Sequence, residues 1–197
     1  KETKEINIFI HEFLLRKSVD QKVGQHGLLA LDWLNGNRSV LMNSDLNGLL
    51  MGLTLNTKPE DIYRAMIEAT AFGTRLIIDV YKRSGINVNE LYACGGLTSN
   101  ELLLQLYSDI SGFGLKVAAS SQTPALGAAI LGAMAVGLKE GGFDSYEEAI
   151  DKMTMPAEKV YKPNPRNQRI YNQMYKNYVL LHDFFGRENP SLMKNLK

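Results

Sequence analysis

The alternation of apolar and polar positions divides the chain into helical and extended segments. Residues 4–17 place apolar side chains three and four positions apart among charged residues, at Ile6, Phe9, Ile10, Phe13 and Leu14. This spacing forms the apolar stripe of an amphipathic helix. The polar run SVDQKVGQHG interrupts the pattern and predicts a connector at residues 18–27.

Residues 28–55 predict antiparallel strands. LLALDWL, residues 28–34, is apolar and is followed by Asn35-Gly36. This dipeptide is favoured in tight hairpin turns, because both central positions of a type I′ turn need a positive φ. The runs RSVLM and GLLMGLTL can supply partner strands. We therefore expect a β-hairpin or a small antiparallel meander over this segment.

A long helix follows these strands. Thr57 and Glu60 form a candidate capping box, with Pro59 in the first turn. The helix is expected to end at Gly85, because glycine suits the position just after a helix C-terminus. Its apolar stripe consists of Ile62, Met66, Ala69, Phe72, Leu76 and Val80.

Short apolar runs then alternate with helical patterns. ELYAC at residues 90–94 and GLKVAAS at residues 114–120 each predict a buried strand. The helices after them are expected to begin at a second capping box, Thr98 with Glu101, and at Thr123 with Pro124. Strands that alternate with helices at these distances argue for a parallel component in an α/β sheet.

The C-terminal residues are predicted to be helical. FDSYEEAIDKM indicates a short helix, MPAEKVYKPNP an extended link marked by prolines, and residues 166–185 a longer helix. The order of elements in the chain is an antiparallel meander followed by βαβα. That is the order of the ribonuclease-H-like fold, which also builds each half of actin-type ATPases. We expect an α/β domain of this kind with added C-terminal helices.

Composition narrows the possible functions. Among 197 residues, 45% are hydrophobic and 22% charged, and the net charge of +1 gives no reason to expect binding to nucleic acid or to a membrane surface. The longest apolar stretch, PALGAAILGAMAVGL, is too short to span a bilayer. The single cysteine, Cys94, allows no internal disulfide and favours a reducing compartment such as the cytoplasm. The chain has no initiator methionine, which fits either processing or a fragment of a longer protein.

Candidate chemistry lies in LYACGGLTSNELLLQLYSDI, where two glycines join a strand to a helix. Gly95 and Gly96 would let a ligand approach the backbone, and the helix N-terminus presents unpaired N–H groups. Such junctions at the carboxyl ends of parallel strands form the usual binding crevice of open α/β sheets. The amide of Asn100 can both donate to and accept from a purine or a ribose. A tight βα turn explains the same glycines, so the residues alone leave both interpretations open.

A metal site is a competing hypothesis. Asp32 at the end of the first strand could hold Mg²⁺, as in ribonuclease-H-like nucleases, if Glu68 and Asp109 converged on it. A nuclease is expected to be more basic than this chain. The three histidines share no metal-ligand spacing, so no metal ligand is assigned. Cys94 is interpreted as a small buried strand residue.

The segment TPALGAAILGAMAVG concentrates small residues at helical spacing. Gly127, Ala128, Ala129, Gly132 and Ala133 allow a helix to approach a sheet or another helix closely. The N-terminus of this helix can contribute to the binding crevice. For the residues past Gly127, close packing is the favoured interpretation.

Four segments, taken together and in order, resemble the FGGY carbohydrate kinases: GLLALDWLNGNRSVL, IYRAMIEATAFGTR, LYACGGLTSNELLLQLYSDI and PALGAAILGAMAVG. Within that family, ALDWLNGNR and ATAFGTR are similar to the ribulokinases, as is the tyrosine-rich tail. The resemblance covers roughly residues 24–140. It suggests three regions: an N-terminal helix and connector over residues 1–23, a nucleotide-binding domain over residues 24–140, and a helical extension over residues 141–197.

The resemblance implies a two-domain, actin-like ATPase fold that transfers the γ-phosphoryl group of MgATP to a ketopentose such as L-ribulose. ATP or ADP and Mg²⁺ are then the expected cofactors. Gly95, Gly96 and Asn100 match the family's adenine-nucleotide motif, and Leu97 and Thr98 line the same loop. Self-association as a homodimer is compatible with this family.

The resemblance also implies parts that this sequence does not show. The family's phosphate loop, its catalytic aspartate and most of its sugar-binding residues belong to an N-terminal domain. No catalytic residue is therefore assigned, and the chain is expected to be an inactive C-terminal part of a kinase. A non-catalytic, actin-like module that binds nucleotide or a protein partner is the alternative.

Overall fold

The computed structural model describes residues 2–120, 122–157 and 159–194, with side chains at 2–8, 97 and 99 left outside the description. The elements group into two compact units. The larger unit comprises Lys1–Val88, Asp109–Gly112 and Pro163–Lys197, and the smaller comprises Asn89–Ser108 and Phe113–Lys162. Both units are discontinuous in sequence. The region boundaries predicted at residues 23 and 140 describe sequence similarity rather than compactness, and they remain predictions.

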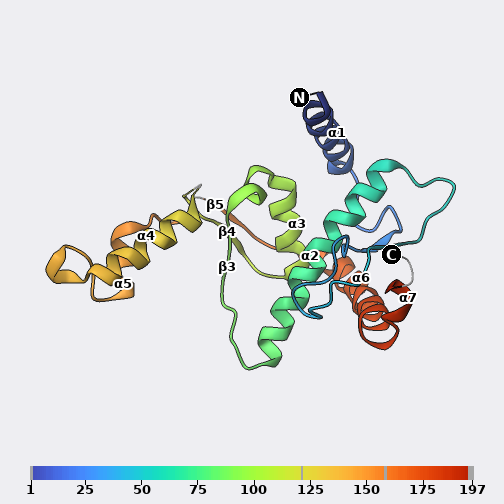
Figure 1. The fold of residues 1–197 in the computed structure, drawn as a ribbon. Helices are drawn as coiled ribbons and strands as arrows, with labels where there is room; N and C mark the ends of the chain where they lie inside the picture. Colours follow the sequence, from blue (N-terminus) through green and yellow to red (C-terminus); the bar gives the residue numbers. More distant parts are fainter. Residues whose placement is uncertain (1, 121, 158, 195–197) are drawn as a thin grey trace. The chain divides into compact units, whose positions relative to one another are not determined.

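The larger unit is built around its longest helix, α2 (Pro59–Arg83). It also contains α1 (Glu2–Val19), the antiparallel strands β1 (Leu29–Leu31) and β2 (Leu49–Met51), and α6 (Pro165–Asp183), followed by a π-helical turn (Phe184–Glu188) and α7 (Ser191–Lys194). Helix α2 packs against α1, β1 and α6 (Figure 1). The buried apolar side chains of this core include Leu28, Ala30, Ala65, Ala69, Phe72, Tyr171 and Tyr178. The predicted helices and the predicted antiparallel pair are confirmed.

The turn between β1 and β2 differs from the predicted tight hairpin. Asn35-Gly36 does not connect the two strands directly, because a long loop separates Leu31 from Leu49, which face each other in the sheet. Within that loop, isolated bridges join Leu34 to Gly36 and Asn37 to Asn43. Prediction of RSVLM as a strand is also wrong. The dipeptide correctly marked a positive φ, 76° at Gly36, but not the turn type.

Gly36 also closes this loop through tight packing. A Cβ at this position would lie 2.6 Å from the Cα of Ser44, whereas a Cβ at Gly27, which has a similar φ of 66°, would meet no described atom within 4 Å. We expect Gly27→Ala to cost about 1–2 kcal/mol of stability, the penalty for a left-handed backbone alone. Gly36→Ala should cost clearly more, measured by urea denaturation. Equal losses would show that the loop yields around Ser44.

Helix α2 begins one residue later than predicted. Asp61, rather than Glu60, accepts a hydrogen bond from the backbone N–H of Lys58 at 2.9 Å. Thr57 instead accepts from the backbone N–H of Thr54 at 2.9 Å. The capping box of Thr57 with Glu60 is therefore wrong, because the local turn uses the threonine hydroxyl. The end of the helix is confirmed, since Gly85 follows it with a φ of 80°.

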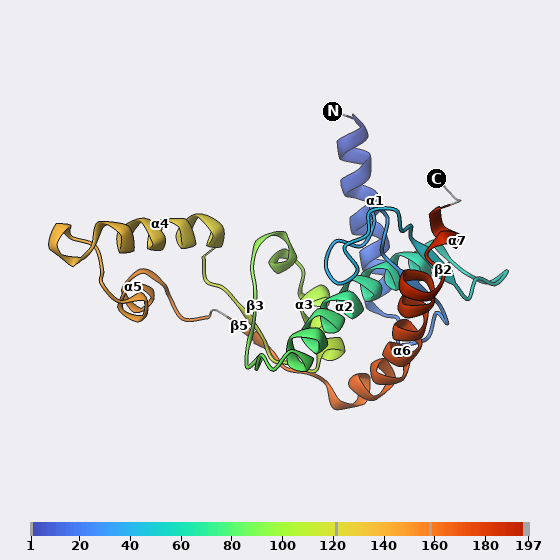
Figure 2. The ribbon, with the colours of Figure 1, turned by 60° about the horizontal axis from the view of Figure 1, so that its bottom comes forward.

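The smaller unit contains a three-stranded sheet in the order β3 (Leu91–Ala93), β4 (Leu115–Val117) and β5 (Lys159–Tyr161). Strands β3 and β4 are parallel, as predicted, and α3 (Glu101–Ser111) connects them. Strand β5 pairs antiparallel with β4, where the sequence indicated only an extended link. The unit is completed by α4 (Thr123–Val136), a 3₁₀ turn (Leu138–Glu140) and α5 (Tyr146–Met153). Helices α4 and α5 lie side by side (Figure 2).

Two helices expose apolar side chains that the sequence pattern suggested would be covered. On α1, Phe9 and Phe13 are 69% and 49% exposed and stack on each other. On α4, Ile130 is buried and the helix contacts α5, whereas Leu131 and Val136 are exposed, so the close packing predicted past Gly127 remains a prediction. Periodicity indicates which face of a helix is apolar, but it does not say whether another element covers that face.

Candidate functional site

The candidate loop begins at the carboxyl end of β3. Cys94, Gly95 and Gly96 are all exposed, so the prediction that Cys94 is buried is wrong. Strand β3 has ended at Ala93, and the chain then enters a 3₁₀ helix over Gly95–Ser99. The backbone N–H of Ala118 donates to the carbonyl of Ala93 at 3.0 Å. This hydrogen bond extends the parallel pairing of β3 and β4 to the carboxyl ends of the two strands. The loop thus occupies the position at which open α/β sheets bind ligands.

The backbone conformation requires glycine at position 95 but not at position 96. Gly95 has a φ of 71°, in the left-handed region, so the turn itself accounts for glycine there. Gly96 has no such φ, and a Cβ built on it would meet no described atom within 4 Å. Neither backbone conformation nor packing among the described residues requires glycine at position 96. A molecule outside this chain that approaches the backbone would require it.

The remaining loop residues fix the turn and start α3. The Thr98 hydroxyl donates to the Gly95 carbonyl at 2.8 Å. Asn100 Oδ1 accepts from the backbone N–H of Leu103 at 3.2 Å and so caps α3. The predicted capping box of Thr98 with Glu101 is therefore wrong, because Asn100 supplies the cap. The side chain of Leu97 lies outside the described residues.

Glu101 is held by a different partner. Its carboxylate forms an ion pair with Lys159 on β5 at 2.5 Å, and this hydrogen bond lowers the pKa of Glu101. Both side chains are more than half exposed, so the pair contributes little to stability. It places a neutralised pair, rather than a free negative charge, in the first turn of α3.

A hollow lies at the same end of the three-stranded sheet as the candidate loop. Its volume is about 970 Å³, and its lining comes from Tyr92 on β3, the segment after β4, α4, α5 and the residues that follow α5. The lining is mostly apolar, with the carboxylates of Glu147 and Asp151 on α5. The loop glycines are not among its described lining residues. The hollow is therefore a neighbour of the candidate loop and not the loop itself.

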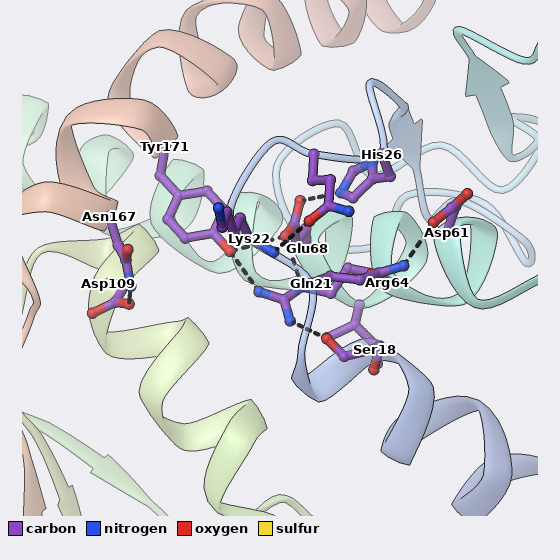
Figure 3. Close-up of polar contacts among 12 residues, drawn as sticks. Ser18, Gln21, Lys22, His26, Asp61, Arg64, Glu68, Asp109, Asn167 and Tyr171 are labelled. Atoms are coloured by element: carbon purple, nitrogen blue, oxygen red, sulfur yellow. Dashed lines mark hydrogen bonds and ion pairs between the residues drawn. The ribbon is translucent and has the colours of Figure 1, made fainter. Parts of the chain in front are cut away.

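The most elaborate polar cluster is in the larger unit, around Glu68 (Figure 3). Its Oε1 accepts from Arg64 Nε at 2.8 Å and from the Tyr171 hydroxyl at 2.8 Å, and its Oε2 lies 3.1 Å from His26 Nε2. Arg64 also donates to the Ser18 carbonyl and to the Tyr171 hydroxyl, each at 3.0 Å. These contacts join α1, the connector, α2 and α6 through buried groups. We call Ser18, His26, Arg64, Glu68 and Tyr171 the Glu68 network.

The protonation of the Glu68 network follows from its hydrogen bonds. The backbone N–H of Leu28 donates to His26 Nδ1 at 3.0 Å, so Nε2 carries a proton and donates to Glu68. Burial alone would raise the pKa of Glu68, but the hydrogen bond from His26 and the charge of Arg64 outweigh it and lower the pKa. Each Glu68 oxygen accepts a hydrogen bond within the protein, so this cluster stabilises the fold rather than presenting a reactive carboxylate.

The sequence contained a signal for this network that its hydrophobic pattern hid. Arg64 and Glu68 are four positions apart and flank Ala65 and Ala69 on the buried side of α2. A charged pair buried on the apolar face of a helix needs hydrogen-bond partners from other elements to replace the water it has lost. His26 and Tyr171, far apart in sequence, supply those partners.

The proposed metal cluster is not formed. The Asp109 carboxylate accepts from the backbone of Asn164 and from the Asn167 side chain, while Glu68 is held in its own network. Burial raises the pKa of Asp32. Across the described ranges, no three His, Cys, Asp or Glu side chains are grouped so that they could hold a metal ion. The structure therefore offers no support for nuclease-type metal chemistry.

Comparison with known proteins decides the family. The C-terminal domain of the FGGY family of carbohydrate kinases matches residues 3–136 of the chain. The chain belongs to the FGGY family. The candidate loop over Gly95–Ser99, which we call the GG loop, lies inside the matched region, as do β1 to β4 and α2.

Similar proteins carry one recurrent name. The chain is 54% identical over 191 residues to a ribulokinase of Anoxybacillus flavithermus and 52% identical over 191 residues to one of Geobacillus thermodenitrificans. In both cases the match covers 96% of this chain and 34% of the relative. The chain therefore spans about a third of the length of the curated relatives it matches.

Solved structures confirm the fold class. A xylulose kinase from Lactobacillus acidophilus superimposes with a TM-score of 0.77 at 22% identity, over 91% of this chain and 35% of that one. A glycerol kinase from Plasmodium falciparum, solved with ADP, gives a TM-score of 0.63 at 23% identity, over 86% of this chain and 35% of that one. The chain therefore has the α/β, actin-like fold of these sugar kinases. Within the described ranges, none of its helices has the length and apolarity needed to cross a bilayer.

Proposed function

We propose that the chain is the nucleotide-binding, C-terminal part of a kinase that transfers the γ-phosphoryl group of MgATP to a ketopentose such as L-ribulose. The names of the relatives support the substrate class, at about half identity over nearly the whole chain. Residues 24–140 would form the nucleotide-binding region, with residues 1–23 and 141–197 as the flanking connector and extension.

One observation carries the nucleotide assignment. Gly96 is exposed at the carboxyl end of a parallel strand, and nothing in the described chain requires glycine there. An adenine nucleotide lying against the Gly96 backbone would require it. Gly95, Leu97 and Thr98 would shape the same loop, and Asn100 would contact the adenine.

The proposal divides the reaction between this chain and the rest of the kinase. Phosphoryl transfer needs a bound nucleotide, a positioned sugar hydroxyl and a base that accepts its proton. This chain would hold and orient the nucleoside. Mg²⁺ would supply charge neutralisation on the phosphates. The base, the phosphate loop and the sugar contacts would come from polypeptide outside the 197 residues, so the chain by itself is expected to be inactive.

The direct test is calorimetric titration of the chain with MgADP and, in parallel, with adenosine. Binding of both ligands would support adenosine recognition by the loop. Binding of neither by this chain, together with binding by a complete kinase that contains it, would assign the loop a role only in the assembled cleft. A complete kinase that binds neither ligand would contradict the proposal.

Asn100 offers a way to separate capping from ligand contact. Asn100→Ala removes the side-chain acceptor for Leu103 N–H and is expected to cost about 1 kcal/mol of stability. Asn100→Asp retains that acceptor but has no amide donor, so it should leave stability unchanged and still weaken adenosine binding. Thermal unfolding and calorimetry on the two variants measure these effects. An Asn100→Asp variant with unchanged adenosine affinity would remove Asn100 from the site.

A further inference from the structure

Helix α3 is hydrogen-bonded along its length to the segment formed by β5 and Lys162. Three side chains of the helix make these contacts, one in each turn: Glu101 with Lys159, Gln105 with Lys162 and Ser108 with Tyr161. Their spacing of four and then three positions puts them on one face of the helix. All of these residues belong to the smaller unit. One side of α3 is therefore attached, within that unit, to β5.

The contact at Ser108 is the buried one of the three. Ser108 is 0% exposed, and its hydroxyl lies 2.9 Å from the Tyr161 carbonyl and 2.8 Å from the Phe113 carbonyl, so it can donate to either. A hydrogen bond inside a protein is stronger than one in water, because the surroundings screen it less. The other two contacts are exposed, and an exposed ion pair contributes little. Ser108 is therefore the strongest polar contact between α3 and β5.

Apolar packing alone defines the position of α3 less well. Leu104, at 1% exposure, packs in a buried cluster of the smaller unit with Ala93, Leu115, Val117 and Tyr161. Apolar burial is non-directional, so it holds the helix on the sheet without setting its position along its own axis. A hydrogen bond requires both a distance and an angle. The buried hydroxyl of Ser108 therefore sets the axial position of the helix.

The axial position of α3 determines where Asn100 lies. Asn100 Oδ1 accepts from the backbone N–H of Leu103, so its side chain is held by the first turn of the helix. The GG loop ends at Ser99, directly before it. An 11-residue α-helix moves as one body, because backbone hydrogen bonds join each turn to the next. A displacement at Ser108 is therefore transmitted to the residue that would contact the adenine.

We propose that Ser108 is a positioning residue for the nucleotide, which places Asn100 and the GG loop by fixing α3 on β5. This role rests on the proposed function, because it takes the loop as the nucleotide site. It also gives a function to β5, which lies beyond residues 3–136, the part matched by the family's C-terminal domain. Ser108 acts through Asn100, so a change at Ser108 should alter nucleotide binding and not sugar binding.

The test compares two serine-to-alanine variants of a complete kinase that contains this chain. Ser108→Ala removes the buried hydroxyl. Ser145→Ala is the matched control, because Ser145 lies in the same unit and caps α5 by accepting from the backbone N–H of Glu148 at 3.3 Å. Each variant loses one hydroxyl and its hydrogen bond, so thermal unfolding should show similar losses. Calorimetry measures the affinity for MgADP, and steady-state kinetics give kcat and the KM values for MgATP and L-ribulose.

We expect Ser108→Ala to weaken MgADP binding and raise the KM for MgATP about threefold to tenfold, the cost of re-ordering a binding group when the ligand binds. The kcat and the KM for L-ribulose should not change, as for a loss of nucleotide binding alone. Ser145→Ala should leave all of these values unchanged. Unchanged nucleotide affinity in Ser108→Ala would overturn the proposal. An equal loss of affinity in both variants would also overturn it, because the effect would then follow stability.

Gln105→Ala decides the question if Ser108→Ala does not fold. It removes the exposed contact with the Lys162 carbonyl, so the fold should be retained. We expect it to weaken MgADP binding about twofold, because this contact orders the helix less than the buried one does. Unchanged affinity in that variant would then overturn the proposal.

Failure of the proposed function would give a different result. A wild-type complete kinase that does not bind MgADP, or one whose affinity is unchanged by Gly96→Val, would contradict the nucleotide site and the positioning role together. A kinase that binds MgADP and is weakened by Gly96→Val, but is insensitive to Ser108→Ala, would contradict only the positioning role.

Discussion

Glu68→Ala is expected to lower the free energy of unfolding by about 3–5 kcal/mol, the range for removing one member of a buried ion pair. The substitution leaves Arg64 buried at 4% exposure without its carboxylate. It also removes the acceptor of the Tyr171 hydroxyl and of His26 Nε2. The Glu68 network joins four segments of the larger unit, so their packing should loosen together. Urea denaturation followed by circular dichroism measures the loss.

A matched exposed pair serves as the control for Glu68. Arg187 and Asp183 are also spaced four positions apart and lie 3.0 Å from each other, but their side chains are 53% and 43% exposed. Arg187→Ala is expected to change stability by no more than about 1 kcal/mol, as for surface pairs in general. If Glu68→Ala cost as little as Arg187→Ala, the network would be only a surface-like contact. That result would contradict the structural role assigned to it.

The same network predicts a dependence of stability on pH. The pKa of Glu68 is lowered in the folded protein from its ordinary value of 4.5. The unfolded state therefore binds the Glu68 proton more readily, and the stabilisation is fully present above pH 4.5 and lost as the pH falls through the folded pKa. The wild-type protein should lose more stability than Glu68→Gln when the pH is lowered from neutral into this range. Parallel losses in both proteins would assign the acid sensitivity to other groups.

Gly96→Val is expected to weaken ADP binding about tenfold or more in the complete kinase, corresponding to at least about 1.4 kcal/mol. The proposed nucleotide lies against the Gly96 backbone, and a branched side chain would occupy that space. The fold should not be affected, because a Cβ at position 96 meets no described atom within 4 Å. Calorimetric titration with MgADP measures the affinity, and thermal unfolding confirms that stability is retained.

Two single variants, Gly95→Ala and Gly96→Ala, supply the comparison for this experiment. Gly95→Ala introduces a side chain at a φ of 71° and is expected to cost about 1–2 kcal/mol of stability. Gly96→Ala should leave stability unchanged and weaken ADP binding less than valine does, in proportion to its smaller size. A folded Gly96→Val kinase with unchanged ADP affinity would contradict the site assignment. Gly96 would then have no part in nucleotide binding.

Local patterns predicted the elements well and their ends less well. Alternation and helical spacing located α2, α3, α4, α5 and α6, and the short apolar runs located β1, β3 and β4, because these signals depend on neighbouring residues alone. Both predicted capping boxes were wrong. Several adjacent polar residues compete for the same backbone N–H groups at each helix start. Asp61 rather than Glu60, and Asn100 rather than Thr98, have the required geometry.

The sequence by itself determined the α/β class, the parallel pairing of β3 with β4 and the family, since all three depend on the order and spacing of segments. Only the tertiary structure decided which glycine the turn requires, because that depends on φ at Gly95 and on the empty space around Gly96. It also revealed the Glu68 network, which joins residues as distant in sequence as His26 and Tyr171. A sequence pattern records that a side chain is charged or apolar. The partner that binds it is chosen by the fold, as the contacts of Glu68 with His26 and Tyr171 show.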